Sequence, residues 1–201
     1  MNNMISIGLP KGGLKKYSLN FISNLIGEPV ESKKLSFSTE NYTIFLLKHR
    51  DIPRFLECGL IDVGITSIEW VEESGIELNL VMMLNWCDTR ISLIESKEKD
   101  RTGDSRSCVT EFPNIASKYF KEQGIECNIF HISGSSEACV PQIFDWCIDC
   151  VETGTTLLEN DLMEKEIILE SKVALFTKYE KVIPQNIMQR IMYALQRCGD
   201  E

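Results

Sequence analysis

The chain alternates short apolar segments with amphipathic segments, and this alternation is the feature that most limits its fold. The first example is the apolar run MISIGL, which ends in the turn PKGG. After the turn, apolar side chains recur at helical spacing, at Leu14, Tyr17, Phe21, Ile22 and Leu25. Because a strand that is followed by a helix usually returns as a parallel strand, the alternation predicts an α/β protein whose parallel sheets are covered by helices.

The same pattern continues to the end of the chain. Strands are predicted at residues 4–9, 34–37, 42–47, 61–65, 78–84, 107–110, 126–132, 146–151 and within 166–177. Helices are predicted at residues 14–25, 51–58, 68–73, 113–123, 136–144, 155–159 and 184–197. Asp51 and Ser67 are suited to cap the helices that follow them, and Pro53 suits a first helical turn. Residues 95–107 are charged and poor in apolar side chains, which predicts an exposed connection between two lobes.

The charge of the chain excludes some classes of partner. Its formal net charge of −9 argues against a broad surface for nucleic acid or for an anionic membrane. No apolar run is long enough to span a bilayer, and the first residues lack the basic start and apolar core of a signal peptide. We therefore expect a cytoplasmic protein that binds neither nucleic acid nor membrane.

The eight cysteines have no spacing typical of a small disulfide scaffold. In a reducing compartment they are expected to be buried thiols. Cys147 and Cys150 form a CxxC motif, but the surrounding FDWCIDCV reads as a strand, and a zinc site needs a second pair of ligands. We therefore predict no metal site formed by the protein.

The most informative local motif is DCVETGTTL, where two acids precede a turn rich in hydroxyl groups. Backbone N–H groups at a helix start are unpaired and favour an anion, Gly154 permits a close approach, and threonines add hydroxyl donors. The carboxylates of Asp149 and Glu152 suit the hydroxyl groups of a ribose. The motif therefore indicates a sugar phosphate ligand, although a plain capped turn flanked by acids fits the local pattern as well.

Two further turns stand between a predicted strand and a predicted helix. In LPKGGL, Gly12 and Gly13 allow exposed amides and Lys11 supplies a cation, although a plain turn also explains the motif. In ISGSSE, Ser135 or Ser136 could act only as a helix cap. All three turns follow the carboxyl end of a strand, where open α/β sheets bind their ligands.

Taken in order, these segments resemble the short form of ATP phosphoribosyltransferase, the first enzyme of histidine biosynthesis. The resemblance covers nearly the full length and is carried by ISIGLPKGGL, SKKLSF, RDIPRFLECGLIDVGIT, FPNIASKYFKEQGI, ISGSSE and DCVETGTTLLENDL. The last motif is the most specific, because the family has a very similar acid-x-x-acid-[Thr/Ser]-Gly-x-Thr-Leu loop.

The resemblance implies an α/β fold of two lobes with type II periplasmic-binding-protein-like architecture and the active site in the interlobe cleft. Lobe I would comprise residues 1–92 plus 173–201, and lobe II would comprise residues 93–172 with the phosphoribosyl-binding loop. The implied reaction joins N1 of the adenine of ATP to the phosphoribosyl group of phosphoribosyl pyrophosphate and releases pyrophosphate. Mg²⁺ would be bound to the substrates. A dimer of the chain and a regulatory subunit similar to histidyl-tRNA synthetase are the implied partners.

The resemblance also assigns roles to residues. Lys11 and Lys33 would be catalytic. Phosphoribosyl pyrophosphate would be bound by Asp149, Glu152, Thr153, Gly154, Thr155, Thr156 and Leu157. ATP or pyrophosphate would be bound by Gly12, Gly13, Ser133, Gly134, Ser135 and Glu137.

The chain departs from the family at three positions that favour anionic substrates. Gly13 stands where the family usually has arginine, Lys33 replaces the arginine of an Arg-Lys-Leu run, and Glu111 stands where lysine is frequent. Other cations of the chain, such as Lys11, Lys48, Arg50 or Arg90, could compensate for these losses. The alternative to a working transferase is therefore a diverged, weakly active or inactive relative that binds a ligand or regulates a partner. A solute-binding module would also fit two lobes, but the absence of an export signal disfavours it.

Overall fold

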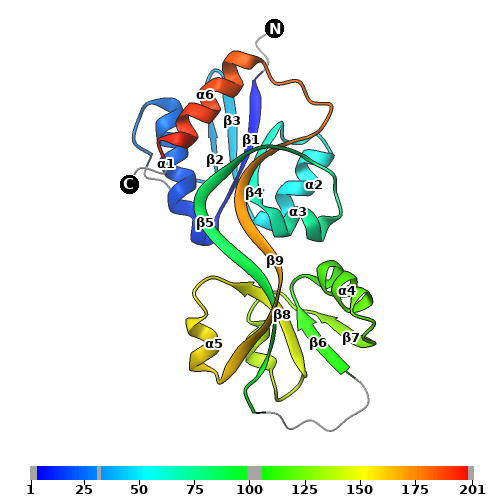
Figure 1. Ribbon diagram of the computed structural model, residues 1–201. Coiled ribbons are helices and arrows are strands. Elements are labelled where there is room, and N and C mark those ends of the chain that lie inside the picture. The colour runs from blue at the N-terminus through cyan, green and yellow to red at the C-terminus, as the bar shows by residue number, and fades with distance from the viewer. Residues whose placement is uncertain (1–3, 31–32, 99–105, 199–201) are drawn as a thin grey trace. The chain divides into compact units, whose positions relative to one another are not determined.

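The computed structural model describes residues 4–30, 33–98 and 106–198, and the chain forms two compact units (Figure 1). Unit 1 comprises Met1–Cys87 and Lys172–Glu201, and unit 2 comprises Asp88–Ser171. The chain enters unit 2 within the long strand β5 (Asn79–Ser96) and leaves it within the long strand β9 (Leu162–Thr177). The sequence placed these boundaries after residues 92 and 172.

Unit 1 is a sheet with helices packed against it. Its strands lie in the order β2-β3-β1-β4-β9, where β1 is parallel to β3 and β4, and β2 and β9 are antiparallel to their neighbours. Its elements, besides parts of β5 and β9, are β1 (Ile5–Pro10), the 3-10 helix η1 (Gly12–Leu14), α1 (Lys15–Ile26), β2 (Ser36–Ser38), β3 (Tyr42–Leu47), η2 (His49–Asp51), α2 (Ile52–Glu57), β4 (Val63–Ser67), α3 (Ile68–Ser74) and α6 (Gln185–Gln196). The predicted helical spacing is confirmed in α1, which buries Phe21, Ile22 and Leu25 in the core.

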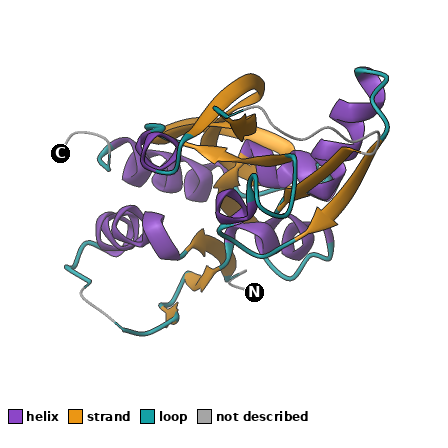
Figure 2. Ribbon diagram, turned by 90° about the horizontal axis from the view of Figure 1, so that it is seen from below, coloured by secondary structure: helices purple, strands orange, loops and turns teal. Residues whose placement is uncertain are grey.

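Unit 2 repeats this construction on a smaller scale. The parallel strands β7, β6 and β8 lie side by side, and β5 pairs with β8 in the antiparallel direction. Its elements are β6 (Arg106–Thr110), α4 (Pro113–Glu122), β7 (Cys127–His131), η3 (Ser136–Cys139), β8 (Trp146–Val151) and α5 (Thr155–Glu159), with parts of β5 and β9. Figure 2 shows the helices in purple against the strands in orange. The predicted α/β class is therefore confirmed, with antiparallel strands added to the parallel ones.

Two local predictions are wrong and a third is incomplete. Residues 136–144 do not form the predicted helix along their whole length, because the 3-10 helix η3 ends at Cys139 and Pro141 has no N–H with which to continue a helical ladder. Residues 95–107 do not connect the units, because the whole segment falls within unit 2, from the end of β5 to the start of β6; its residues 99–105 lie outside the described residues. The strand predicted at 78–84 forms but is longer than predicted, since it is the start of β5, whose polar middle hides the rest of the strand pattern.

The predicted caps are only partly right. Asp51 and Ser67 occupy the N-cap positions of α2 and α3, but neither side chain makes a capping hydrogen bond. The Ser67 hydroxyl instead donates to Oε1 of Glu69 at 2.5 Å. Pro53 lies in the first turn of α2, as predicted.

The cysteines are free thiols, and the CxxC motif lies in a strand as predicted. Cys147 and Cys150 are three residues apart on β8, so their side chains point to opposite faces of the sheet and cannot share one metal ion. Burial raises the pKa of the Cys147 thiol, which keeps it protonated.

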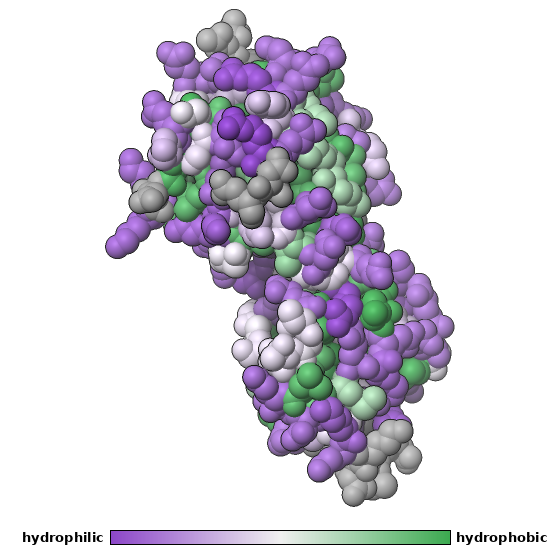
Figure 3. Space-filling view, turned by 60° about the vertical axis from the view of Figure 1, so that its left-hand side comes forward, coloured by the Kyte–Doolittle hydropathy of each residue, from purple (hydrophilic) through white to green (hydrophobic). Residues whose placement is uncertain are grey.

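One face of the described residues is largely polar (Figure 3). The space-filling view in Figure 3 shows a face on which hydrophilic side chains predominate, with apolar ones in small groups. No helix in the described part of the chain has the length and apolar character that a membrane crossing requires.

Candidate active site

Three loops of unit 2 follow the carboxyl ends of the parallel strands β6, β7 and β8. They begin at Glu111, Ile132 and Glu152 respectively. Because these strands are parallel neighbours, their carboxyl ends lie at one edge of the sheet, and the three loops lie along that edge. This is the edge at which open α/β sheets bind ligands.

The loop after β8 makes a left-handed turn at Gly154 directly before the start of α5. Gly154 has φ 76° and ψ 2°, in the left-handed region that favours glycine, and it is the N-cap of α5. The hydroxyl oxygens of Thr153 and Thr155 lie 3.0 Å apart. Leu158 makes the first helical hydrogen bond, to the carbonyl oxygen of Gly154 at 3.2 Å. The amides before Leu158 make no bond of the helical ladder, and the Thr155 N–H lies 3.5 Å from Oγ1 of Thr153, to which it donates.

The side chains of this loop divide into two kinds. Thr153, Thr155 and Thr156 are exposed and can offer hydroxyl groups. Leu157 is buried, and its side chain packs in the apolar core of unit 2 with Val151 and Leu162. Leu157 can therefore contribute to a ligand only through its backbone, while its side chain anchors the helix start.

Asp149 links this loop to the loop after β7. Its Oδ2 accepts a hydrogen bond from the hydroxyl group of Ser136, and its Oδ1 accepts the N–H of Cys150 at 2.7 Å. Ser136 is fully buried. A carboxylate has about four acceptor positions, so Asp149 retains capacity for a ligand hydroxyl. Sequence reasoning considered Ser136 only as a helix cap, because its partner lies on a different strand.

The loop after β7 also has a tight backbone. Gly134 has φ 91° and Ser135 has φ 55°, so two successive residues adopt left-handed conformations, while Ser133 is exposed. Glu137 is half-buried, and its pKa is raised, first by burial and then by the negative charges of Asp149 and Glu111. The structure thus brings Asp149 and Glu137 together at an acidic edge, which suits ligand groups that donate hydrogen bonds.

Arg90 holds the backbone where the loop after β8 begins. Its guanidinium donates to the carbonyl oxygen of Glu152 at 3.0 Å and to both carboxylate oxygens of Glu164. The Glu152 side chain itself is exposed. Sequence reasoning named Arg90 only as a spare cation, since β5 is distant from the loop in sequence.

The other residues named from the sequence lie on unit 1. Lys11, Gly12 and Gly13 follow β1, and the Lys11 N–H donates to the carbonyl oxygen of Leu47 at 2.8 Å, which joins the ends of β1 and β3. Lys33 is exposed and precedes β2, the edge strand of the sheet. The predicted site residues therefore fall into two groups, one on each unit.

A polar group that the sequence did not reveal lies at the carboxyl ends of β3 and β4. The hydroxyl group of Ser67 is 3.4 Å from Nδ1 of His49 and donates to Glu69. Burial lowers the pKa of His49 to about 4, so its imidazole is neutral at neutral pH. A buried serine next to histidine and glutamate has no signal in the sequence, because the three residues come from separate elements.

A metal site formed by the protein is absent from the part of the chain that the structure describes. Within residues 4–30, 33–98 and 106–198, no group of three or more His, Cys, Asp or Glu side chains is arranged to hold a metal ion.

Comparison with known proteins identifies the family. The family model described as ATP phosphoribosyltransferase matches residues 48–197. An ATP phosphoribosyltransferase of Aquifex aeolicus is 32% identical over 206 residues, which cover 98% of this chain and 96% of that protein. One of Campylobacter fetus is 29% identical over 185 residues, which cover 90% of this chain and 91% of that protein.

Solved structures show the same fold. The ATP phosphoribosyl transferase (HisG:HisZ) complex from Thermotoga maritima matches with a TM-score of 0.85 at 22% identity, over 96% of this chain and 100% of that one. A putative L-cystine ABC transporter protein from Listeria monocytogenes matches with a TM-score of 0.63 at 12% identity, over 96% of this chain and 89% of that one. These likenesses agree with the predicted type II periplasmic-binding-protein-like fold. From the family match and the relatives, the chain belongs to the ATP phosphoribosyltransferase family.

Proposed function

We propose that this chain is a catalytic subunit of ATP phosphoribosyltransferase. It is a pentosyltransferase that joins the phosphoribosyl group of phosphoribosyl pyrophosphate to N1 of the adenine of ATP, in the first step of histidine biosynthesis. The observation that carries the site assignment is the loop after β8, where Gly154 is left-handed, Thr153 and Thr155 present hydroxyl groups, and Asp149 lies on the adjoining strand.

The loop after β8 holds the 5-phosphate of the substrate. The amides of Thr153–Leu157 and the hydroxyl groups of the threonines donate to the phosphate oxygens, and the start of α5 favours negative charge. The carboxylates of Asp149 and Glu152 accept hydrogen bonds from the ribose hydroxyls. One substrate thus satisfies both the donors and the acceptors of the loop.

The reaction forms a bond between N1 of adenine and the anomeric carbon, and it breaks the bond from that carbon to the pyrophosphate oxygen. Positive charge develops on the sugar and negative charge on the leaving group. The carboxylates of Asp149 and Glu152 stabilise charge on the sugar, and cations must stabilise the charge on the leaving group. Lys11 and Lys33 fill that role. The residues that bind ATP or pyrophosphate are Gly12, Gly13, Ser133, Gly134, Ser135 and Glu137.

Mg²⁺ belongs to the substrates in this account. Divalent cations are commonly bound through substrate phosphates and only one or two protein carboxylates. When bound, Mg²⁺ would neutralise part of the charge of the pyrophosphate group.

The active form of the protein is a hetero-oligomer in the cytoplasm. We propose a dimer of this chain together with a regulatory subunit similar to histidyl-tRNA synthetase. The similar structure from Thermotoga maritima is that of a HisG:HisZ complex, which supports a partner of this kind. The predicted interlobe location of the active site stays part of the proposal.

The direct test is turnover by the purified chain, with and without a synthetase-like partner. Phosphoribosyl-ATP and pyrophosphate are expected in equal amounts, and only when both substrates are present. Tight binding of phosphoribosyl pyrophosphate without pyrophosphate release, even with the partner, would contradict the proposal and favour the alternative of an inactive binding subunit. None of the relatives reported above favours that alternative.

A further inference from the structure

Arg90 lies at the stem of the loop after β8 and contacts its backbone. On β5, Arg90 pairs with Val151, the last residue of β8, and its Nη1 donates to the carbonyl oxygen of the next residue, Glu152, at 3.0 Å. The guanidinium therefore holds the backbone at the first residue of the loop by a hydrogen bond. Hydrogen bonds from a charged donor to a backbone carbonyl are stronger than those between neutral groups.

Glu164 fixes the guanidinium in place. Nε and Nη2 of Arg90 donate to Oε1 and Oε2 of Glu164 at 2.6 and 2.7 Å, a bidentate pair, and the hydroxyl group of Ser92 donates to Oε1 at 2.5 Å. The hydrogen bonds from Arg90 are the largest cause that lowers the pKa of Glu164, so the pair is ionised at neutral pH. Both side chains are partly shielded from solvent, with 29% and 23% of their surface exposed.

The network closes the loop at both of its stems. Glu152 follows β8, and Glu164 lies on β9, the strand that follows α5. Arg90 thus connects the carboxylate of Glu164, after the loop, to the carbonyl oxygen of Glu152, at its start. A phosphate site made of backbone amides needs its donors held within about 0.5 Å of the productive geometry, and such precision requires a supporting shell of hydrogen bonds.

We propose that Arg90, held by Glu164, is a positioning residue for the phosphoribosyl loop. It acts through the backbone of Glu152 and sets the direction of the amides that follow. Three of its five N–H donors are engaged in these contacts, and its charge is balanced by Glu164. Arg90 therefore does not replace the missing cations of the leaving-group site. This proposal rests on the proposed function, because it concerns the same loop.

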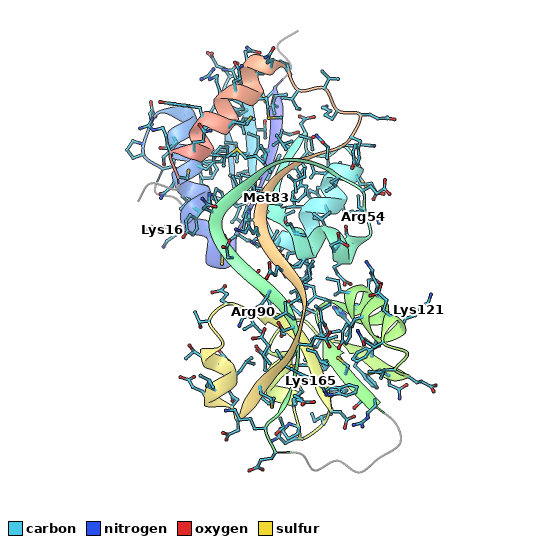
Figure 4. All side chains as sticks on the ribbon, in the orientation of Figure 1. Lys16, Arg54, Met83, Arg90, Lys121 and Lys165 are labelled. Carbon is cyan, nitrogen blue, oxygen red and sulfur yellow. The ribbon has the colours of Figure 1, made fainter. Side chains whose placement is uncertain are left out.

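The chain offers a matched control on the same two strands. Lys165 on β9 pairs with Glu95 on β5 at 2.8 Å, next to Glu164 in sequence but with no contact to the loop among the contacts described. Figure 4 labels Arg90 and Lys165 on the ribbon of unit 2. Replacing Lys165 by alanine removes an ion pair between β5 and β9 and leaves the Arg90 network intact.

The experiment measures by calorimetry the binding of three ligands. Ribose 5-phosphate and pyrophosphate are the two parts of phosphoribosyl pyrophosphate, and ATP is the other substrate. Arg90→Lys keeps the charge but loses the fork, and Glu164→Gln keeps the shape but loses the charge. Each variant is expected to weaken ribose 5-phosphate binding by about tenfold or more, with pyrophosphate and ATP unchanged. The double variant should lose little more than either single one, because both act through one network. Lys165→Ala should match the wild type for all three ligands.

Two results would overturn the proposal that Arg90 positions the loop. Both can be distinguished from the result that would refute the proposed function. If Arg90→Lys weakens pyrophosphate binding but not ribose 5-phosphate binding, Arg90 is a direct cation for the leaving group. If all three ligands weaken together in the Arg90 and Glu164 variants, the pair is only structural. If the wild type binds no ribose 5-phosphate and no phosphoribosyl pyrophosphate, the proposed function fails and this inference fails with it.

Discussion

Substituting Gly154 by alanine tests whether the backbone of the loop after β8 is the working part of the site. Gly154 has φ 76°, and a Cβ placed there meets no atom within 4 Å. The cost is therefore backbone strain alone, about 1–2 kcal/mol for a residue with a Cβ in the left-handed region. Reduced freedom of the unfolded chain offsets about 0.4–1 kcal/mol of this cost. The net loss of unfolding free energy should be about 1 kcal/mol.

Gly124 provides a control with the same geometry. It follows α4 in unit 2, has φ 66°, and a Cβ there also meets no atom within 4 Å. Gly124→Ala should thus lose about the same unfolding free energy, about 1 kcal/mol. The two variants differ only in whether the strained residue lies in the proposed phosphate loop.

The assay combines urea unfolding with calorimetric titration of phosphoribosyl pyrophosphate. In Gly154→Ala, relief of strain moves the amides away from the phosphate, and the Kd should rise by about tenfold. In Gly124→Ala, the Kd should be that of the wild type. If both variants lose stability equally and both keep the wild-type Kd, the amides of the loop do not hold the phosphate.

Three further predictions concern single side chains. Thr155→Ala removes a hydroxyl group that lies 3.0 Å from that of Thr153, and it should raise the Kd for phosphoribosyl pyrophosphate about tenfold with an unchanged melting temperature, because Thr155 is exposed. His49 has a pKa of about 4 against an ordinary 6.5, so its contribution to stability is complete above pH 6.5 and is lost as the pH falls toward 4. At 1.36 kcal/mol per pKa unit this contribution is at most about 3 kcal/mol, and urea unfolding should show a shallower loss between pH 7 and 4.5 in His49→Gln. Glu137 has a raised pKa, so its ionisation costs stability as the pH rises through that value. Glu137→Gln should therefore melt at a higher temperature than the wild type at pH 7.5, and the difference should vanish near pH 4; an equal difference at both pH values would refute the burial of a charge there.

The sequence predicts those parts of the fold that local patterns determine. The helical spacing in α1 and the apolar run of β1 are local, and both elements form where expected. The strand β5 was predicted only in part. Its middle contains the polar residues Asn85, Asp88 and Thr89, and its apolar and polar side chains do not alternate regularly. Its hydrogen-bonding partner β8 is distant in sequence and supplies the pairing that local preferences do not show.

The candidate site shows the same division. The loop after β8 was recognisable because its acids, glycine and threonines are contiguous in sequence. The supports of the loop were not recognisable. The hydroxyl group of Ser136, in the loop after β7, donates to Asp149 on β8, and Arg90 on β5 donates to the carbonyl oxygen of Glu152. Both hydrogen bonds form only once the sheet has brought these strands together. Sequence reasoning therefore finds residues that a ligand would touch more readily than residues that position them.

The most direct test of the central claim is a map of the backbone amides that respond to phosphoribosyl pyrophosphate in ¹⁵N–¹H spectra of the 201-residue chain. The account predicts large changes at the amides of Thr153, Gly154, Thr155 and Thr156, and the same changes with ribose 5-phosphate alone. Changes confined to other residues, with these four amides unmoved at saturation, would contradict it.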